Sequence, residues 1–247
     1  MKALTFRKLS KTYKNGVQAL KGIDLEVEEG DFFALLGPNG AGKTTAIGIV
    51  TSLVNKSGGE VEIFGHDLDR ELAVAKACIG VVPQEINLNM FERSDYTLIN
   101  QAGYYGVPPK VARERAEKYL KALHLWDKRA GIARTLSGGM KRRLMIARAL
   151  VHEPRNVVLD EPGNGLDVMT TRALREFLLR LRGDGRCVLF SSHLMHEVAQ
   201  LCDRIVVIAH GRVVASGTPE ELRAATGCAS LEDAFVAAIG SEEGLYA

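Results

Sequence analysis

The sequence predicts an α/β protein with a mainly parallel β-sheet, a small antiparallel β layer and an inserted α-helical subdomain. Short apolar runs alternate with helical patterns along the chain, as in sheets whose strands are buried on both faces. Hairpin turn signals occur towards both ends of the chain. A long stretch in the middle instead has helical spacing.

Antiparallel hairpins are expected near both ends. Residues 4–27 have the pattern of short strands, and Asn15-Gly16 within them is a strong hairpin turn signal. A second hairpin is expected where the runs 204–209 and 212–215 flank His210-Gly211. These segments predict an antiparallel layer beside the parallel core.

Five apolar runs predict the buried parallel strands. They are Phe32–Leu36, Ile79–Val82, Val157–Leu159, Val188–Phe190 and Ile205–Ile208. Each run ends in a loop, and most of these loops lead into a helical pattern. Because ligands of such sheets bind beyond the carboxyl ends of the strands, functional residues are expected in these loops.

Helical patterns mark the subdomain and the tail. The stretch from Met90 to Leu136 is helical in pattern, and Lys110–Leu125 has near-helical apolar spacing, so a subdomain is expected at about residues 88–150. Thr218-Pro219 is an N-cap with proline at the first helical position. We expect a main domain of residues 1–225 and a C-terminal helical tail of residues 226–247.

Composition narrows the class of protein. A net charge of +2 gives no electrostatic reason to expect direct nucleic-acid binding. No apolar run follows the basic residues of Met1–Lys8, and no segment approaches the ~18 apolar residues of a membrane helix. The four cysteines form no CxxC pair and match no zinc spacing, so buried thiols in a reducing cytosol are expected.

A phosphate-binding loop follows the first parallel strand. Its motif, G-x-x-x-x-G-K-[ST], comprises Gly37, Pro38, Asn39, Gly40, Ala41, Gly42, Lys43 and Thr44, and Thr45 follows. The glycines let backbone N–H groups turn towards phosphate oxygens, and the next helix directs its positive dipole end to the same place. Lys43 supplies charge for the β- and γ-phosphates, and Thr44 offers a hydroxyl to Mg²⁺. A plain glycine-rich turn is the alternative.

Two carboxylates end the strand that begins near Asn156. On a buried parallel strand, Asp160 and Glu161 are expected beside the phosphate loop. Asp160 is expected to hold Mg²⁺, directly or through water. Glu161 is expected to orient and deprotonate the attacking water, because a metal-bound oxygen is a poor base. Alone, the pair fits a capped strand end equally well; the phosphate loop favours the catalytic interpretation.

The run Leu136-Ser137-Gly138-Gly139-Met140 resembles the signature motif of the ABC ATPases. The resemblance extends over nearly the whole chain and is strongest to the ATP-binding subunits of bacterial ABC-2-type exporters, including drug and sodium extrusion types. It implies an ABC ATP-binding domain with a P-loop NTPase (RecA-like) core, and Mg²⁺-dependent ATP hydrolysis coupled to transport. Export rather than import rests on the resemblance within Met90–Gly106.

The resemblance implies a role for several further residues. Tyr13 matches the aromatic residue that stacks on adenine, although an edge-strand tyrosine is the alternative. Gln84 matches the glutamine that senses Mg²⁺ and the attacking water, and its segment begins the surface that faces the membrane partner. His193 matches the switch histidine at the γ-phosphate. Residues 164–167 resemble the loop that links the two active sites of a dimer.

A dimer would give the signature motif a role in nucleotide binding. Ser137, Gly138 and Gly139 would start the helix that runs from Met140 to Val151, and exposed N–H groups at that end attract anions. The family pattern places this end against the γ-phosphate bound by the opposite subunit. The resemblance therefore implies a homodimer with ATP at its interface, and hydrolysis that opens it.

The implied partner is a separate integral-membrane permease, so the chain is expected to be cytoplasmic and peripheral on the inner face of the cell membrane. The permease would set the transported substrate. Two alternatives remain: a soluble ABC ATPase acting in DNA repair or translation, and a regulatory protein that binds ATP without hydrolysing it. The first is disfavoured by the lack of an inserted coiled coil, zinc-type cysteine pairs or a second cassette, and the second by intact Glu161 and His193.

Three positions depart from the family pattern, and one basic run needs an interpretation. Gly163 replaces the usual Thr or Ser and is expected to loosen the loop after the acidic pair, Val168 replaces a proline or small polar residue, and Met140 replaces glutamine, as in the exporter group. The basic run Lys141-Arg142-Arg143 is interpreted as the solvated face of the signature helix rather than a nucleic-acid site.

Overall fold

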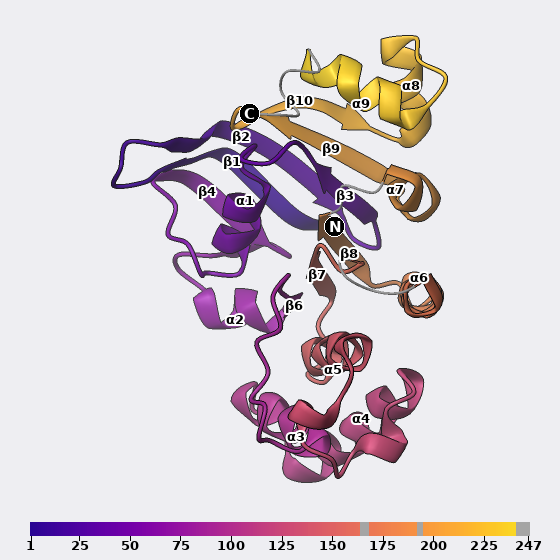
Figure 1. Cartoon of the computed structure of the whole chain (residues 1–247). Helices are drawn as coiled ribbons and strands as arrows, with labels where there is room; N and C mark the ends of the chain where they lie inside the picture. The colour runs from indigo at the N-terminus through magenta and orange to yellow at the C-terminus, as the bar shows by residue number, and fades with distance from the viewer. Residues whose placement is uncertain (164–167, 192–194, 241–247) are drawn as a thin grey trace.

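The computed structural model describes residues 1–163, 168–191 and 195–240, which form two β-sheets with helices around them (Figure 1). The strands are β1 (Lys2–Thr12), β2 (Gln18–Glu28), β3 (Phe32–Leu36), β4 (Gly58–Ile63), β5 (His66–Asp67), β6 (Ile79–Val82), β7 (Asn156–Asp160), β8 (Cys187–Ser191), β9 (Arg204–Ala209) and β10 (Arg212–Gly217). The α-helices are α1 (Lys43–Val50), α2 (Leu72–Ala77), α3 (Ser94–Tyr104), α4 (Pro109–Ala122), α5 (Gly138–Leu150), α6 (Val168–Gly183), α7 (Met195–Leu201), α8 (Pro219–Thr226) and α9 (Leu231–Ile239), with short 3-10 turns at Trp126–Lys128 and Ala133–Thr135.

The larger sheet is mainly parallel, as predicted. Its strand order is β10-β9-β3-β8-β7-β6, and each neighbouring pair from β9 to β6 is parallel. The five predicted apolar runs are its five parallel strands. The predicted hairpin at His210-Gly211 joins β9 to the antiparallel edge strand β10, with both turn residues at positive φ (50° and 74°).

The smaller sheet is antiparallel, with the order β2-β1-β4-β5. The predicted Asn15-Gly16 turn joins β1 to β2, with Gly16 at a φ of 83°. Strands β4 and β5 were not predicted, because β4 begins with two glycines and β5 has only two residues. Pairing with β1 makes β4 a strand, which is a tertiary rather than a local effect.

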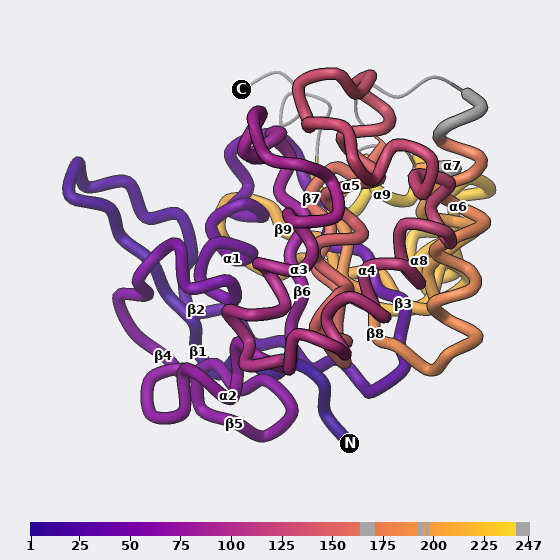
Figure 2. The backbone as a smooth tube through the Cα atoms, turned by 90° about the horizontal axis from the view of Figure 1, so that it is seen from below, coloured from indigo at the N-terminus to yellow at the C-terminus, as the bar shows by residue number. Residues whose placement is uncertain are grey.

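The parallel sheet is buried on both faces, because alternate side chains of each strand enter different cores. Phe32, Ala34 and Leu36 join the apolar cluster built with the helices from α3 to α9. Phe33 and Leu35 join the cluster shared with α1 and the antiparallel sheet. In both views the antiparallel sheet and helix α6 lie on opposite sides of the parallel strands (Figure 1, Figure 2).

Helices α3, α4 and α5 form a group at one end of the molecule, and α8 and α9 lie at the opposite end (Figure 1). Helix α4 matches the predicted segment, and it buries Ala116, Tyr119 and Leu120. Helix α8 begins at the predicted N-cap, where Thr218 and Glu221 form a reciprocal capping box. Among the described residues, no helix has the length and apolar character needed to cross a membrane.

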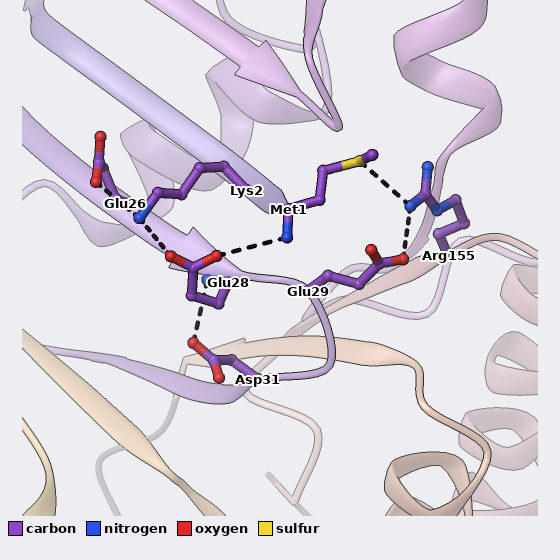
Figure 3. Close-up of polar contacts among 7 residues, drawn as sticks. All are labelled: Met1, Lys2, Glu26, Glu28, Glu29, Asp31 and Arg155. Atoms are coloured by element: carbon purple, nitrogen blue, oxygen red, sulfur yellow. Dashed lines mark hydrogen bonds and ion pairs between the residues drawn. The ribbon is translucent and has the colours of Figure 1, made fainter.

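A polar cluster at the N-terminus connects the two sheets (Figure 3). Lys2 pairs with Glu26 at 2.9 Å and with Glu28, both on β2. Arg155, which directly precedes β7, pairs with Glu29 after β2, at 2.5 Å. Because these groups are exposed and screened by solvent, we expect these ion pairs to contribute little to the stability of the fold.

Candidate active site

The carboxyl ends of three parallel strands meet at one cavity. The loop after β3, the acids at the end of β7 and the residue two positions after β6 all reach it. The cavity has a volume of about 520 Å³ and is lined by Gly37, Pro38, Asn39, Lys43, Thr44, Gln84, Asp160, Glu161, Met195, Glu232, Phe235 and Val236. The structure therefore brings the predicted loop, glutamine and acidic pair together.

Two glycines of the loop before α1 are required for steric reasons. Gly42 has a φ of 112°, and a Cβ atom there would lie 2.6 Å from the carbonyl oxygen of Ala19. A Cβ atom on Gly37 would lie 2.2 Å from the carbonyl oxygen of Ile208. A smaller concavity of about 130 Å³ is lined by Asn39, Gly40, Ala41, Gly42, Lys43, Thr44 and Thr45. The first N–H groups of α1 are thereby available to an anion.

Lys43 bends back over the loop that precedes it. Its Nζ donates to the carbonyl oxygens of Gly37 and Pro38, at 2.5 and 3.0 Å. Burial lowers the pKa of the Lys43 ammonium, and the charges of Glu161 and Asp160 oppose that change. The ammonium group therefore lies in a partly desolvated site, where its attraction for phosphate is stronger than in water.

Tyr13 lies near the phosphate loop. Its hydroxyl is 3.2 Å from Thr45 Oγ1, and its side chain is 38% exposed, which leaves ring surface open to a ligand. The ammonium group of Lys11 lies 5.0 Å from the ring centroid. This geometry is compatible with the predicted adenine contact.

The acidic pair is hydrogen-bonded by Ser191, a residue for which the sequence predicts no function. Ser191, fully buried at the end of β8, donates from Oγ to Asp160 Oδ1 at 2.6 Å. The same Oγ accepts from the main-chain N–H of Glu161 at 3.0 Å. Glu161 has a φ of 47°, in the left-handed region that is unfavourable for a residue with a Cβ atom. Nothing in the local sequence distinguishes Ser191 from an ordinary strand-end serine.

Arg142 corrects the interpretation of the basic run as a solvated helix face. Its side chain is only 4% exposed, and it donates to the carbonyl oxygens of Pro83 at 2.6 Å and Gln84 at 2.8 Å. A longer contact of 3.4 Å reaches the carbonyl oxygen of Glu161. Burial lowers the pKa of its guanidinium group, and the negative charge of Asp160 opposes that change.

Arg143 is also partly buried, and its guanidinium group donates to the carbonyl oxygen of Leu123. The sequence interpretation was wrong because a basic residue can reach main-chain carbonyls far away in sequence.

The C-terminal helix contributes an unexpected wall of the cavity. Glu232, Phe235 and Val236 of α9 line it, and Phe235 is 6% exposed. The helix packs against β9, β10 and α7. Helical spacing alone could not indicate which part of the molecule this apolar face would meet.

The signature residues lie at the start of α5, where Ser137 is the N-cap and accepts from the N–H of Met140 at 3.3 Å. In the described part of the chain, Ser137, Gly138 and Gly139 do not line the cavity of the same molecule. His193 and the loop 164–167 lie outside the described residues.

The cavity is lined by oxygen-containing side chains that could bind a magnesium ion together with the phosphates of a nucleotide. A hydroxyl of Thr44, an amide of Gln84 and a carboxylate of Asp160 line it together. Mg²⁺ prefers oxygen ligands and commonly combines one or two protein carboxylates with substrate phosphates. The donor set therefore fits Mg²⁺ in the company of a nucleotide.

Comparison with known proteins agrees with this geometry. The family model described as ABC transporter matches residues 20–164. The linearmycin resistance ATP-binding protein of Bacillus subtilis is 36% identical over 230 residues, which cover 90% of this chain and 74% of that protein. The daunorubicin/doxorubicin resistance ATP-binding protein of Streptomyces peucetius is 38% identical over 219 residues, which cover 89% of this chain and 66% of that protein.

Solved structures give the same result. A structure described as the ATP-binding subunit of an ABC transporter has a TM-score of 0.88 at 28% identity, covering 96% of this chain and 99% of that one. A dimeric, post-hydrolysis ATP-binding cassette bound to ADP and Pi has a TM-score of 0.79 at 28% identity, covering 87% of this chain and 98% of that one. The chain belongs to the ABC transporter family, as an ATP-binding subunit that hydrolyses ATP and has exporter-type relatives.

Proposed function

We propose that this chain binds MgATP in the cavity at the carboxyl edge of the parallel sheet and uses hydrolysis to drive a separate membrane permease, in the direction of export. The main support is the convergence of Lys43, Thr44, Gln84, Asp160 and Glu161 on one cavity. The exporter direction is supported by relatives described as Nod factor export and drug resistance proteins.

The proposed reaction is in-line transfer of the γ-phosphoryl group to water. The oxygen of water forms a bond to the γ-phosphorus, and the bond to the bridging oxygen of ADP breaks. Glu161 accepts the proton of the attacking water, while Gln84 orients that water. Lys43 and the loop N–H groups neutralise charge on the phosphate oxygens, and Tyr13 stacks on adenine. His193 contacts the γ-phosphate in this proposal, on the strength of the family resemblance.

Thr44, Gln84 and Asp160 are the residues that would hold Mg²⁺. When bound, the ion neutralises charge on the β- and γ-phosphates. The buried hydrogen bond from Ser191 to Asp160 supports this role, because it restricts the rotation of a carboxylate that lines the cavity.

The signature residues are proposed to act on the ATP of a second copy of the chain. Ser137 caps α5 by accepting from the N–H of Met140, and among the described residues that line the cavity of the same molecule none belongs to the signature motif. A homodimer would bring them to the opposite nucleotide, with residues 164–167 as the linking loop. Dimeric relatives support this arrangement.

We further propose that residues 1–225 form the ATP-binding domain, that about 88–150 form its helical subdomain, and that 226–247 form a tail. The helical subdomain would contact the permease, so that the protein is cytoplasmic and peripheral on the inner face of the membrane. A relative described as part of a transporter complex with other subunits supports such an assembly.

The test compares two single variants with the wild-type chain. Glu161→Gln removes the proposed base, so turnover should fall by roughly 10²–10⁴-fold while ATP affinity persists. Lys43→Ala should instead weaken ATP binding, because it removes the buried ammonium group. Steady-state phosphate release and binding of a fluorescent ATP analogue measure the two effects. Wild-type turnover in Glu161→Gln would discard the assigned base, and wild-type affinity in Lys43→Ala would contradict the phosphate loop.

A further inference from the structure

The main chain of Glu161 occupies a conformation that requires support. Its φ of 47° lies in the left-handed region, which is unfavourable for a residue with a Cβ atom. The following residue is Pro162, which restricts the backbone of Glu161 further. Such a conformation persists only where surrounding contacts enforce it.

Ser191 supplies one of these contacts and links both acids. Its hydroxyl has one proton to donate, and Asp160 Oδ1 accepts it at 2.6 Å, a short distance typical of a hydrogen bond to a carboxylate. A lone pair of the same oxygen accepts the N–H of Glu161 at 3.0 Å. One fully buried hydroxyl therefore fixes both the carboxylate rotation of Asp160 and the turn at Glu161.

The position of Ser191 in the sheet explains why its hydroxyl can reach both Asp160 and the main chain of Glu161. Strand β8 lies between β3, which leads into the phosphate loop, and β7, which carries the acids. In the strand register, Ser191 lies opposite Leu35 on one side and Asp160 on the other. A hydroxyl at this place lies between the loop and the acids without exposure to solvent.

Arg142 contacts the next peptide group, on the carbonyl side of Glu161. Its guanidinium donates to the carbonyl oxygen of Glu161 at 3.4 Å and, more closely, to those of Pro83 and Gln84. Because these contacts of Arg142 do not involve Ser191, we expect the main chain around Glu161 to keep its path when Ser191 is substituted. Loss of the Ser191 hydroxyl should therefore misalign the acids without unfolding the protein.

We infer that Ser191 is a positioning residue for hydrolysis, which orients Asp160 and holds the Glu161 backbone in its left-handed turn. This inference rests on the proposed roles of Asp160 and Glu161. Ser191 itself contacts neither nucleotide nor water in this scheme, so its removal should lower kcat far more than it changes the KM for ATP.

The test uses variants that differ in one hydroxyl group. Ser191→Thr keeps the hydroxyl group. Ser191→Val has nearly the same shape as the threonine variant but lacks the hydroxyl group. Ser191→Ala removes the hydroxyl without adding volume, which covers the case in which valine prevents folding. Thermal unfolding confirms that each variant is folded before its turnover is measured.

We expect Ser191→Ala and Ser191→Val to lower kcat by about 10- to 100-fold, as misplacement of catalytic groups does. The KM for ATP should change less than about threefold, and Ser191→Thr should retain most of the turnover. A second readout is independent of hydrolysis: the gain in affinity for a fluorescent ATP analogue when Mg²⁺ replaces EDTA. This gain should shrink in the alanine and valine variants and persist in the threonine variant.

Wild-type turnover in Ser191→Ala, or equal turnover in the threonine and valine variants, would overturn the inference. Glu161→Gln, measured in parallel, separates this failure from that of the proposed function. Low turnover in Glu161→Gln with full turnover in Ser191→Ala overturns the role of Ser191 alone. Full turnover in Glu161→Gln instead overturns the assigned base.

Discussion

At the scale of single residues, buried polar side chains decide much of the local chemistry. His152, two positions after the end of α5, stacks on Tyr105 with ring centroids 3.7 Å apart. Its Nε2 lies 3.0 Å from the carbonyl oxygen of Ile79, so the neutral ring donates from that nitrogen. Burial, together with the charges of Arg115 and Arg186, lowers the pKa of His152 to about 4.

This pKa predicts a pH dependence of stability. Unfolded His152 takes up a proton as the pH falls below about 6.5, whereas the folded protein resists protonation until about pH 4. Its contribution is therefore fully present above the unfolded pKa and is lost progressively as the pH falls to 4. The loss amounts to at most about 3 kcal/mol.

Urea unfolding at pH 7.5 and pH 5 measures this effect. His152→Gln keeps an N–H donor for Ile79 but does not titrate, so its stability should fall less between the two pH values than that of the wild type. His124→Asn, at an exposed position, is the control and should behave as the wild type. If His152→Gln and wild type lost equal stability, burial of His152 would not contribute to the acid sensitivity.

At the scale of elements, close backbone approach fixes how α5 lies against the sheet. A Cβ atom on Gly80 of β6 would lie 2.1 Å from the carbonyl oxygen of Ala149 and 2.9 Å from Pro154 Cγ. Helix α5 carries Arg142 and the signature residues, and β6 leads to Gln84. The spacing of these two elements therefore affects both the Gln84 segment and the acids.

Gly80→Ala should destabilise the protein by about 1–3 kcal/mol, because β6 and α5 must separate to admit the methyl group. Gly103→Ala in α3 is the matched control, since no heavy atom lies within 4 Å of the added Cβ. That exposed helical position should gain about 0.5–1 kcal/mol from the alanine. Urea denaturation gives both values, and equal effects of the two substitutions would contradict the close packing of β6 and α5.

At the scale of the whole molecule, the signature residues of the same chain are not among the described residues that line the cavity. They start helix α5, within the helical group at the end of the molecule opposite α8 and α9 (Figure 1). The proposed dimer would supply them from a second copy. Dimer formation should therefore depend on ATP and on the signature residues, while ATP binding to one copy should not.

Gly139→Glu tests this division in a Glu161→Gln background, which prevents hydrolysis. An added carboxylate at the start of α5 should repel the γ-phosphate of the other copy and abolish the ATP-dependent dimer. Affinity of the single chain for a fluorescent ATP analogue should remain within about twofold, since the site is elsewhere. Light scattering after size exclusion measures the dimer. Gly103→Glu is the matched control and should still dimerise; a persistent dimer in Gly139→Glu would argue against the proposed interface.

Local sequence patterns suffice to predict the parallel strands and the polar residues at their carboxyl ends. Apolar runs such as Phe32–Leu36 form strands because they can be buried on both faces. The glycine motif before Lys43 predicts the phosphate loop, although the carbonyl oxygens that exclude a Cβ atom at Gly37 and Gly42 belong to Ile208 and Ala19, in other strands. The hairpin turns and the Thr218 cap are equally local, so neighbouring residues suffice to predict them. Parallel topology then places the loop and the acids at one edge.

Which distant groups support that edge depends on how the chain folds in three dimensions. Arg142 reaches Pro83 across 59 positions of sequence, and Ser191 reaches Asp160 across 31. Strand β4 exists through its pairing with β1, and α9 lines the cavity through its packing on β9 and β10. Sequence patterns report local conformation and the side of burial, whereas hydrogen bonds between segments depend on relative positions that only the folded chain fixes.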